Sequence, residues 1–139
     1  MTAKEYLMQY RKSMNRINEL TVHIEELRAI CNKITPKYGT GGGTTAASDK
    51  LGAAVAKLVD AEDDAVMEIT QLRQTLTAVQ KVISSVQNDR YRNLLYRRYI
   101  CGNTWEQIAV SMHYTYRNIT YLHGKALLAA EKIISKQKP

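Results

Sequence analysis

The sequence contains no phenylalanine, one tryptophan, two prolines and two cysteines among its 139 residues, and four of its seven glycines lie in one short segment. A sandwich or barrel of short strands needs many more turn-forming residues than this chain offers. Hydrophobic residues make up 45% of the chain and charged residues 24%, which is a normal globular balance and argues against wholesale disorder. We therefore predict an all-α protein.

Several kinds of site and segment are also missing from the sequence. Cys31 and Cys101 stand far apart, outside any Cys-x-x-Cys or Cys/His cluster, so we expect no zinc site and no disulfide framework, and both cysteines to be reduced and partly buried. No histidine spacing or Ser/His/Asp arrangement indicates a metal, a cofactor or an enzyme. The chain has no apolar run long enough for a membrane span or a signal peptide. The expected protein is therefore a cytoplasmic one without catalytic function.

Two long amphipathic helices are predicted within residues 1–88, at about residues 2–35 and about residues 48–88. The apolar positions of the first are Tyr10, Met14, Ile17, Leu20, Ile24, Leu27, Cys31 and Ile34. Those of the second are Leu51, Val55, Leu58, Ala65, Ile69, Leu72, Leu76, Val79, Ile83 and Val86, with Glu62 as the one interruption. Residues 36–47 between the helices are rich in glycine and threonine and predict a flexible connector.

Neither long helix can bury its apolar stripe alone. The alternating steps of three and four residues in the second helix are those of a coiled-coil seam. We expect the two helices to form a long antiparallel hairpin, an arm that pairs either within one chain or with another copy. An arm of this kind predicts a homo-oligomer, most simply a dimer.

Positive charge is concentrated in residues 89–139, which contain nine basic and three acidic residues. A segment of this density is suited to contacting a polyanion such as the phosphate backbone of DNA. It is equally consistent with a solvated basic face that has no partner. Charge alone does not separate these two interpretations.

The pattern of caps after residue 88 predicts shorter helices. A helix at 89–100 is expected to end at Gly102, because glycine tolerates the left-handed conformation found just past helix ends. Thr104 followed by Gln107 is a capping box, which predicts a helix over residues 105–112. Gly124, inside the last helix, is expected to mark the close approach of a neighbouring helix, because glycine is otherwise unfavourable there.

His113 and Tyr114 are predicted to form a tight turn, after which Thr115 caps the last helix. Two helices joined by a turn of about three residues, with polar and basic groups on the first turns of the second, have the layout of a helix-turn-helix. In that motif the first turns of the second helix face the base edges in the major groove of DNA. The expected architecture is a helical arm, residues 1–88, followed by a helix-turn-helix domain, residues 89–139.

The run RYICGNTWEQIAVSMHYTYRNITYLHGKALLAAEKI resembles region 4 of bacterial sigma factors. The order of its features is a helix, a threonine and an aromatic residue before EQIA, a turn, a second threonine cap and a recognition helix ending in KAL. With its two-helix arm, the whole chain is similar to a family of small sigma-like transcriptional regulators of phages and prophages of Gram-positive bacteria. The specific motifs cover about residues 88–135.

The resemblance implies that side chains of the last helix approach the bases of double-stranded DNA and that Lys125 lies nearer the phosphate backbone of the DNA. Arg117 is suited to a bidentate contact with guanine, and two of the arginines on the preceding helix are expected to contact phosphates. The predicted DNA-binding set is Thr115, Tyr116, Arg117, Asn118, Thr120, Tyr121, Lys125, Arg97 and Arg98. Basic residues are frequent in the family at the positions where this chain has Tyr116, Asn118 and Thr120, which indicates either a different target sequence or a surface specialised for contacts other than bases.

Three functional hypotheses follow from the sequence. The first is a sequence-specific transcription regulator of the phage type with an oligomerising arm. The second is a DNA-packaging subunit that resembles the small terminase subunit. The third is an adaptor that docks on host RNA polymerase through the arm and has little DNA affinity of its own.

Overall fold

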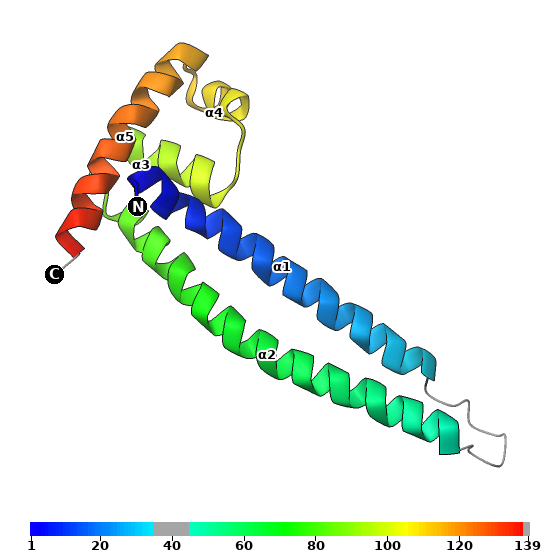
Figure 1. Ribbon diagram of the computed structural model, residues 1–139. Coiled ribbons are helices and arrows are strands. Elements are labelled where there is room, and N and C mark those ends of the chain that lie inside the picture. The colour runs from blue at the N-terminus through cyan, green and yellow to red at the C-terminus, as the bar shows by residue number, and fades with distance from the viewer. Residues whose placement is uncertain (35–44, 138–139) are drawn as a thin grey trace. The chain divides into compact units, whose positions relative to one another are not determined.

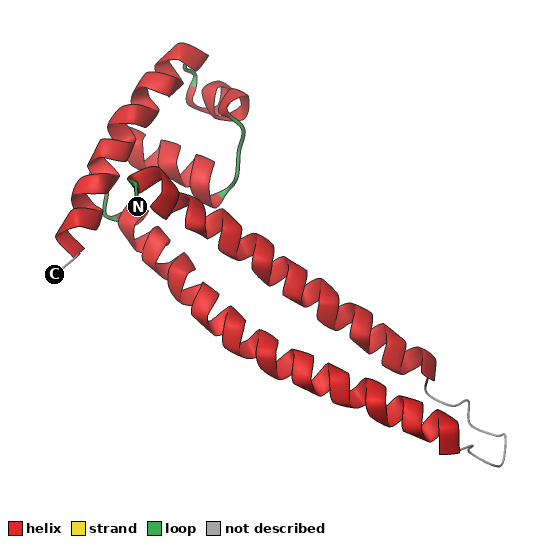
Figure 2. Cartoon of the chain, viewed as in Figure 1, coloured by secondary structure: helices red, strands yellow, loops and turns green. Residues whose placement is uncertain are grey.

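The structure, a computed structural model, describes residues 1–34 and 45–137, and these residues form helices joined by short loops without any strand (Figures 1 and 2). The elements are α1 (Ala3–Ile34), α2 (Thr45–Ser84), α3 (Asp89–Leu95), the π-helical turn η1 (Tyr96–Ile100), α4 (Trp105–Met112) and α5 (Tyr116–Gln137). The predicted all-α class is confirmed. No helix in the described ranges is long and apolar enough to cross a bilayer.

The predicted bounds of the second long helix, 48–88, are wrong at both ends. It begins at Thr45, because no glycine or proline separates that residue from Ser48. It ends at Ser84, because the Asn88 side chain caps the following helix by accepting the backbone N–H groups of Arg90 and Tyr91. A cap of this kind starts a new helix instead of extending the old one. Most of the predicted connector, residues 36–44, lies outside the described residues.

The chain divides into two compact units, and α1 and α2 each contribute to both. The arm unit consists of residues 15–72, and the core unit of residues 1–14 together with residues 73–139. The predicted boundary between residues 88 and 89 does not coincide with this division. The reason is that both ends of the predicted arm supply side chains to the hydrophobic core of the core unit.

In the arm unit α1 and α2 run antiparallel within one chain (Figure 1). Arg16 pairs with Glu68 at 2.7 Å, and Arg28 pairs with Glu62 at 3.1 Å, so residue numbers rise on one helix as they fall on the other. The Arg16 guanidinium holds the pKa of the Glu68 carboxyl below its usual value. Glu62, which interrupts the predicted apolar stripe, is therefore placed for an ion pair across the hairpin. Val55 belongs to the predicted apolar stripe but is 42% exposed, so the prediction that its side chain is covered is wrong.

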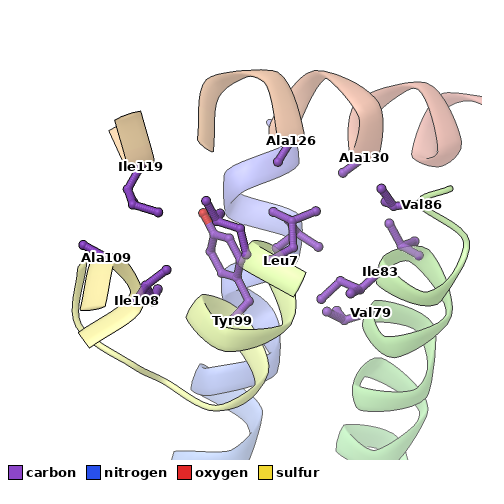
Figure 3. Close-up of a cluster of buried hydrophobic side chains, with 13 residues drawn as sticks. Leu7, Val79, Ile83, Val86, Tyr99, Ile108, Ala109, Ile119, Ala126 and Ala130 are labelled. Carbon is purple, nitrogen blue, oxygen red and sulfur yellow. The ribbon is translucent and has the colours of Figure 1, made fainter. Parts of the chain in front are cut away.

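The hydrophobic core of the core unit draws on every helix (Figure 3). Its buried members are Leu7, Val79, Val82, Ile83, Val86, Leu94, Leu95, Tyr99, Ile108, Ala109, Ile119, Ala126 and Ala130. Leu7 comes from the first turns of α1 and is fully buried, although it lies outside the predicted stripe of that helix. The N-terminal part of α1 is therefore a structural part of the core unit.

The predicted helix at 89–100 is α-helical only as far as Leu95. Its last five residues form the π-helical turn η1, in which the Cys101 backbone N–H donates to the Tyr96 carbonyl at 3.1 Å. The wider turn keeps Tyr99 buried at 3% exposure, and insertions of this type are found mostly as single turns inside or beside α-helices. Cys101, predicted to be partly buried, follows the turn and is exposed.

The expected role of Gly124 is also wrong. Gly124 is exposed, and a Cβ built at this position would meet no atom within 4 Å. It lies on the outer side of α5, away from Ala126 and Ala130, so no neighbouring helix requires a glycine there. Gly102 favours glycine because its φ is +73°, a conformation that other residues rarely adopt, whereas an added Cβ would only displace the flexible end of the Arg11 side chain.

Candidate nucleic-acid interface

The first helix of the predicted helix-turn-helix is fixed by the predicted cap. The Thr104 hydroxyl accepts the Gln107 backbone N–H at 3.2 Å, and the Gln107 side chain accepts the Thr104 backbone N–H at 2.9 Å. The capping box is therefore confirmed, and α4 starts at Trp105 as predicted. Ile108 and Ala109 are buried and anchor α4 on the core.

The turn between α4 and α5 depends on a left-handed residue. His113 has a φ of +60°, and the backbone N–H of Tyr114 donates to the Ala109 carbonyl at 2.9 Å. The Thr115 hydroxyl then accepts the Asn118 backbone N–H at 3.1 Å and caps α5. The predicted tight turn and the predicted cap are both confirmed, and together they set the direction in which α5 leaves the turn.

Replacing His113 by glycine is expected to stabilise the core unit by about 0.5–1 kcal/mol, because a side chain at positive φ is strained and glycine is not. Urea unfolding followed by the fluorescence of Trp105, the one tryptophan of the chain, measures the change. The matched control is Val110→Gly. This residue is 76% exposed in the middle of α4, where glycine is expected to destabilise by about 0.5–1 kcal/mol. Equal destabilisation by both variants would contradict the prediction.

The first turns of α5 present a polar face that no other described part of the core unit covers. Arg117, Asn118 and Thr120 are exposed, Tyr116 is 56% exposed and Tyr121 is 65% exposed. Ile119 is buried between them and holds the helix on the core. The side chains predicted to approach DNA bases therefore point away from the core, as a recognition helix requires. We call Tyr116, Arg117, Asn118, Thr120 and Tyr121 the α5 face.

Two of the predicted site residues make contacts within α5 itself. The Thr120 hydroxyl donates to the Tyr116 carbonyl at 3.1 Å, so its proton is already used inside the helix. Lys125 Nζ lies 5.0 Å from the centre of the Tyr121 ring, one turn away. The Tyr121 side chain raises the pKa of Lys125, and this lysine is positively charged at neutral pH.

The two arginines predicted from the preceding helix are not part of the α5 face. Arg98 donates from Nη1 to the Asn103 carbonyl at 3.0 Å, and its guanidinium lies 4.2 Å from the centre of the Trp105 ring. Arg97 donates from Nε to Asn93 Oδ1 at 3.0 Å. Arg98 thus braces the loop between η1 and α4, a role that its charge and sequence position do not reveal.

Arg90, which is not in the predicted set, borders the α5 face. It lines one shallow cavity together with Tyr114, Asn118, Tyr121 and Leu122. No sequence pattern distinguishes Arg90 from the other arginines of this helix, because its position depends on how α3 packs against α5. A second hollow contains Lys125, Lys132 and Lys136 of α5 and extends the positive charge along the same helix.

His123 connects the elements that hold α5 in place. Its Nε2 lies 2.7 Å from the Tyr99 hydroxyl, and its ring meets the Trp105 ring edge-on with the ring centres 4.5 Å apart. Burial, with a smaller contribution from the charges of Lys4 and Arg98, lowers the pKa of His123 to about 4. Burial likewise raises the pKa of Tyr99 to about 12. The cluster is therefore neutral at physiological pH and joins η1, α4 and α5.

Charge is distributed unequally between the two units. The core unit contains 14 basic and 4 acidic residues, whereas the arm unit contains 6 basic and 9 acidic residues. The arm unit is thus not suited to contact a polyanion. Within residues 1–34 and 45–137, no group of His, Cys, Asp and Glu residues is arranged to hold a metal ion. No family model, curated protein or solved structure matches this chain.

Proposed function

We propose that this protein is a sequence-specific transcription regulator, of the sigma-region-4-like phage type, that binds double-stranded DNA through the α5 face. The observation that carries the proposal is the exposure of five neighbouring polar or aromatic side chains on the first turns of α5 while Ile119 behind them is buried. The capped turn before α5 resembles that of helix-turn-helix proteins, in which such a face enters the major groove.

Each group on the α5 face has a role in this proposal. Arg117 reads a base, because its planar guanidinium can donate two hydrogen bonds to one guanine. Tyr121 offers a hydroxyl to phosphate and a ring to a thymine methyl group. Arg90 and Lys125 border the face and neutralise flanking phosphates, which sets the register of the protein on the duplex.

Replacing Arg117 by alanine is expected to weaken binding to the preferred sequence by about 1–3 kcal/mol and to affect random DNA much less, because a base contact is lost. The preferred duplex is first selected from a randomised library with the full chain. Fluorescence anisotropy across a salt series then compares the selected and the random duplexes. The control, Arg73→Ala, removes the same charge from an exposed position on α2 and is expected to leave the preference intact.

Two results would overturn this proposal. One is a selection that enriches no sequence. The other is an Arg117→Ala variant that keeps the full discrimination between the selected and the random duplex. Light scattering on the same sample tests the packaging hypothesis, since that hypothesis predicts a closed ring of many subunits while regulation predicts a monomer or dimer.

A further inference from the structure

Three cationic side chains from separate segments line one cavity in the core unit. Lys4 and Arg11 come from the first turns of α1, and Arg98 comes from η1. Met8, Tyr99 and Gly102 complete the lining of this cavity, which has a volume of about 330 Å³. None of its lining residues belongs to the α5 face or to α5, so the cavity is a separate site.

The two guanidinium groups donate to backbone carbonyls at the end of η1 and in the loop that follows it. Arg11 donates from Nη1 to the Ile100 carbonyl at 3.3 Å, and Arg98 donates from Nη1 to the Asn103 carbonyl at 3.0 Å. A guanidinium has five N–H groups, so these bonds leave donors on both side chains for a ligand. Gly102 leaves space for the Arg11 side chain, since a Cβ there would lie 2.8 Å from its guanidinium carbon.

The positive charge of this cavity is not balanced by carboxylates. Within the described ranges 1–34 and 45–137, none of the ion pairs includes Lys4, Arg11 or Arg98. Like charges held near one another repel, and the cost falls when an anion lies between them. The field of Lys4 and Arg98 also reaches His123, where it adds to the effect of burial in lowering the pKa.

We propose that this cavity binds a phosphate group, with Lys4, Arg11 and Arg98 as its ligands. Guanidinium groups fixed in position suit phosphate because each presents a planar fork of donors to two oxygens. The volume admits a diphosphate or the phosphate end of a small phosphorylated compound. This proposal does not depend on DNA binding by the α5 face.

The bound phosphate would act on the helix-turn-helix through groups already in contact. Arg98 lies against Trp105, and Trp105 and Tyr99 both contact His123 of α5. A bound anion would offset the charges that Lys4 and Arg98 direct at His123, and protonation of its imidazole would become easier. Occupancy of the cavity can therefore be observed at His123 as well as at the cavity itself.

The experiment is a titration of the full chain with sodium pyrophosphate at pH 7, followed by the NMR signals of the backbone amides and the histidine rings. We expect saturable shifts at Gly102 and Asn103. In a second series recorded at decreasing pH with and without saturating pyrophosphate, we expect the midpoint of the His123 titration to move upward from its value of about 4. Lys4→Gln is expected to weaken binding about tenfold, because it removes one charged ligand. The matched control is Lys12→Gln, which removes the same charge from an exposed position on α1 outside the cavity.

A second titration with a short random-sequence DNA duplex identifies the source of the phosphate. If the duplex shifts the Gly102 signal of the wild-type chain but not that of Lys4→Gln, the proposal is supported and the bound phosphate belongs to the DNA backbone. If pyrophosphate shifts these signals and the duplex does not, the proposal is supported and the bound phosphate belongs to a free phosphorylated compound. The proposal is overturned if neither ligand gives saturable shifts at the cavity, or if Lys12→Gln weakens binding as much as Lys4→Gln does.

Discussion

Replacing Leu7 by alanine is expected to lower the free energy of unfolding of the core unit by about 2–5 kcal/mol. Leu7 is fully buried and belongs to a cluster whose other members come from α2 to α5 (Figure 3). Truncating it removes apolar contacts and leaves a cavity that the surrounding side chains cannot close completely. Urea unfolding followed by Trp105 fluorescence measures the loss, because this tryptophan lies in the core unit.

The matched control is Val22→Ala on the same helix. Val22 is 51% exposed and lies in the arm unit, so its truncation is expected to change stability by no more than about 0.5 kcal/mol. The comparison tests whether the first turns of α1 belong to the core unit. If Leu7→Ala unfolds at the same urea concentration as the wild-type chain, the first turns of α1 do not belong to the hydrophobic core of the core unit.

The stability of the core unit is expected to fall as pH decreases from about 6.5 to about 4, by an amount on the order of 2 kcal/mol from His123. Burial lowers the pKa of the folded His123 to about 4, whereas in the unfolded chain the group titrates near its ordinary value of 6.5. The unfolded state therefore takes up a proton first as the solution becomes acidic. The stabilisation is complete above pH 6.5 and is lost once the pH passes below 4.

His123→Phe tests this origin, because phenylalanine keeps an aromatic ring beside Trp105 and cannot bind a proton. Its unfolding free energy, measured with urea at a series of pH values, should lack most of the decrease between pH 6.5 and 4 that the wild-type chain shows. The control is His113→Gln, which removes an exposed histidine and should keep the wild-type slope. A wild-type slope in His123→Phe would assign the pH dependence to the carboxylates instead.

The features that the sequence predicted correctly are those that involve neighbouring residues. The capping box of Thr104 and Gln107, the turn at His113 and the cap at Thr115 are each formed within a span of a few residues. Their hydrogen bonds depend on local backbone geometry, so residue type and spacing were sufficient. The exposure of the polar side chains on the first turns of α5 was predictable from the helical period.

The features that the sequence missed depend on packing between distant segments. Leu7 and Val82 are fully buried, but their helices offer several apolar positions, and only the arrangement of the core selects among them. Arg98 was predicted to lie beside the recognition helix, but its guanidinium packs against Trp105 and donates to the Asn103 carbonyl, away from the α5 face. The π-helical turn has no known residue signature in this segment, and its effect is to place Tyr99 beside His123.

The discontinuous make-up of the core unit has a consequence for synthesis on the ribosome. Leu7 emerges early, yet its partners Ile119, Ala126 and Ala130 are more than a hundred residues later in the chain. Contacts of such long sequence separation form late and slow the folding of a domain. The hairpin of α1 and α2 can close while the polypeptide is still being elongated, but the tertiary structure around Leu7 must wait until α5 has left the exit tunnel.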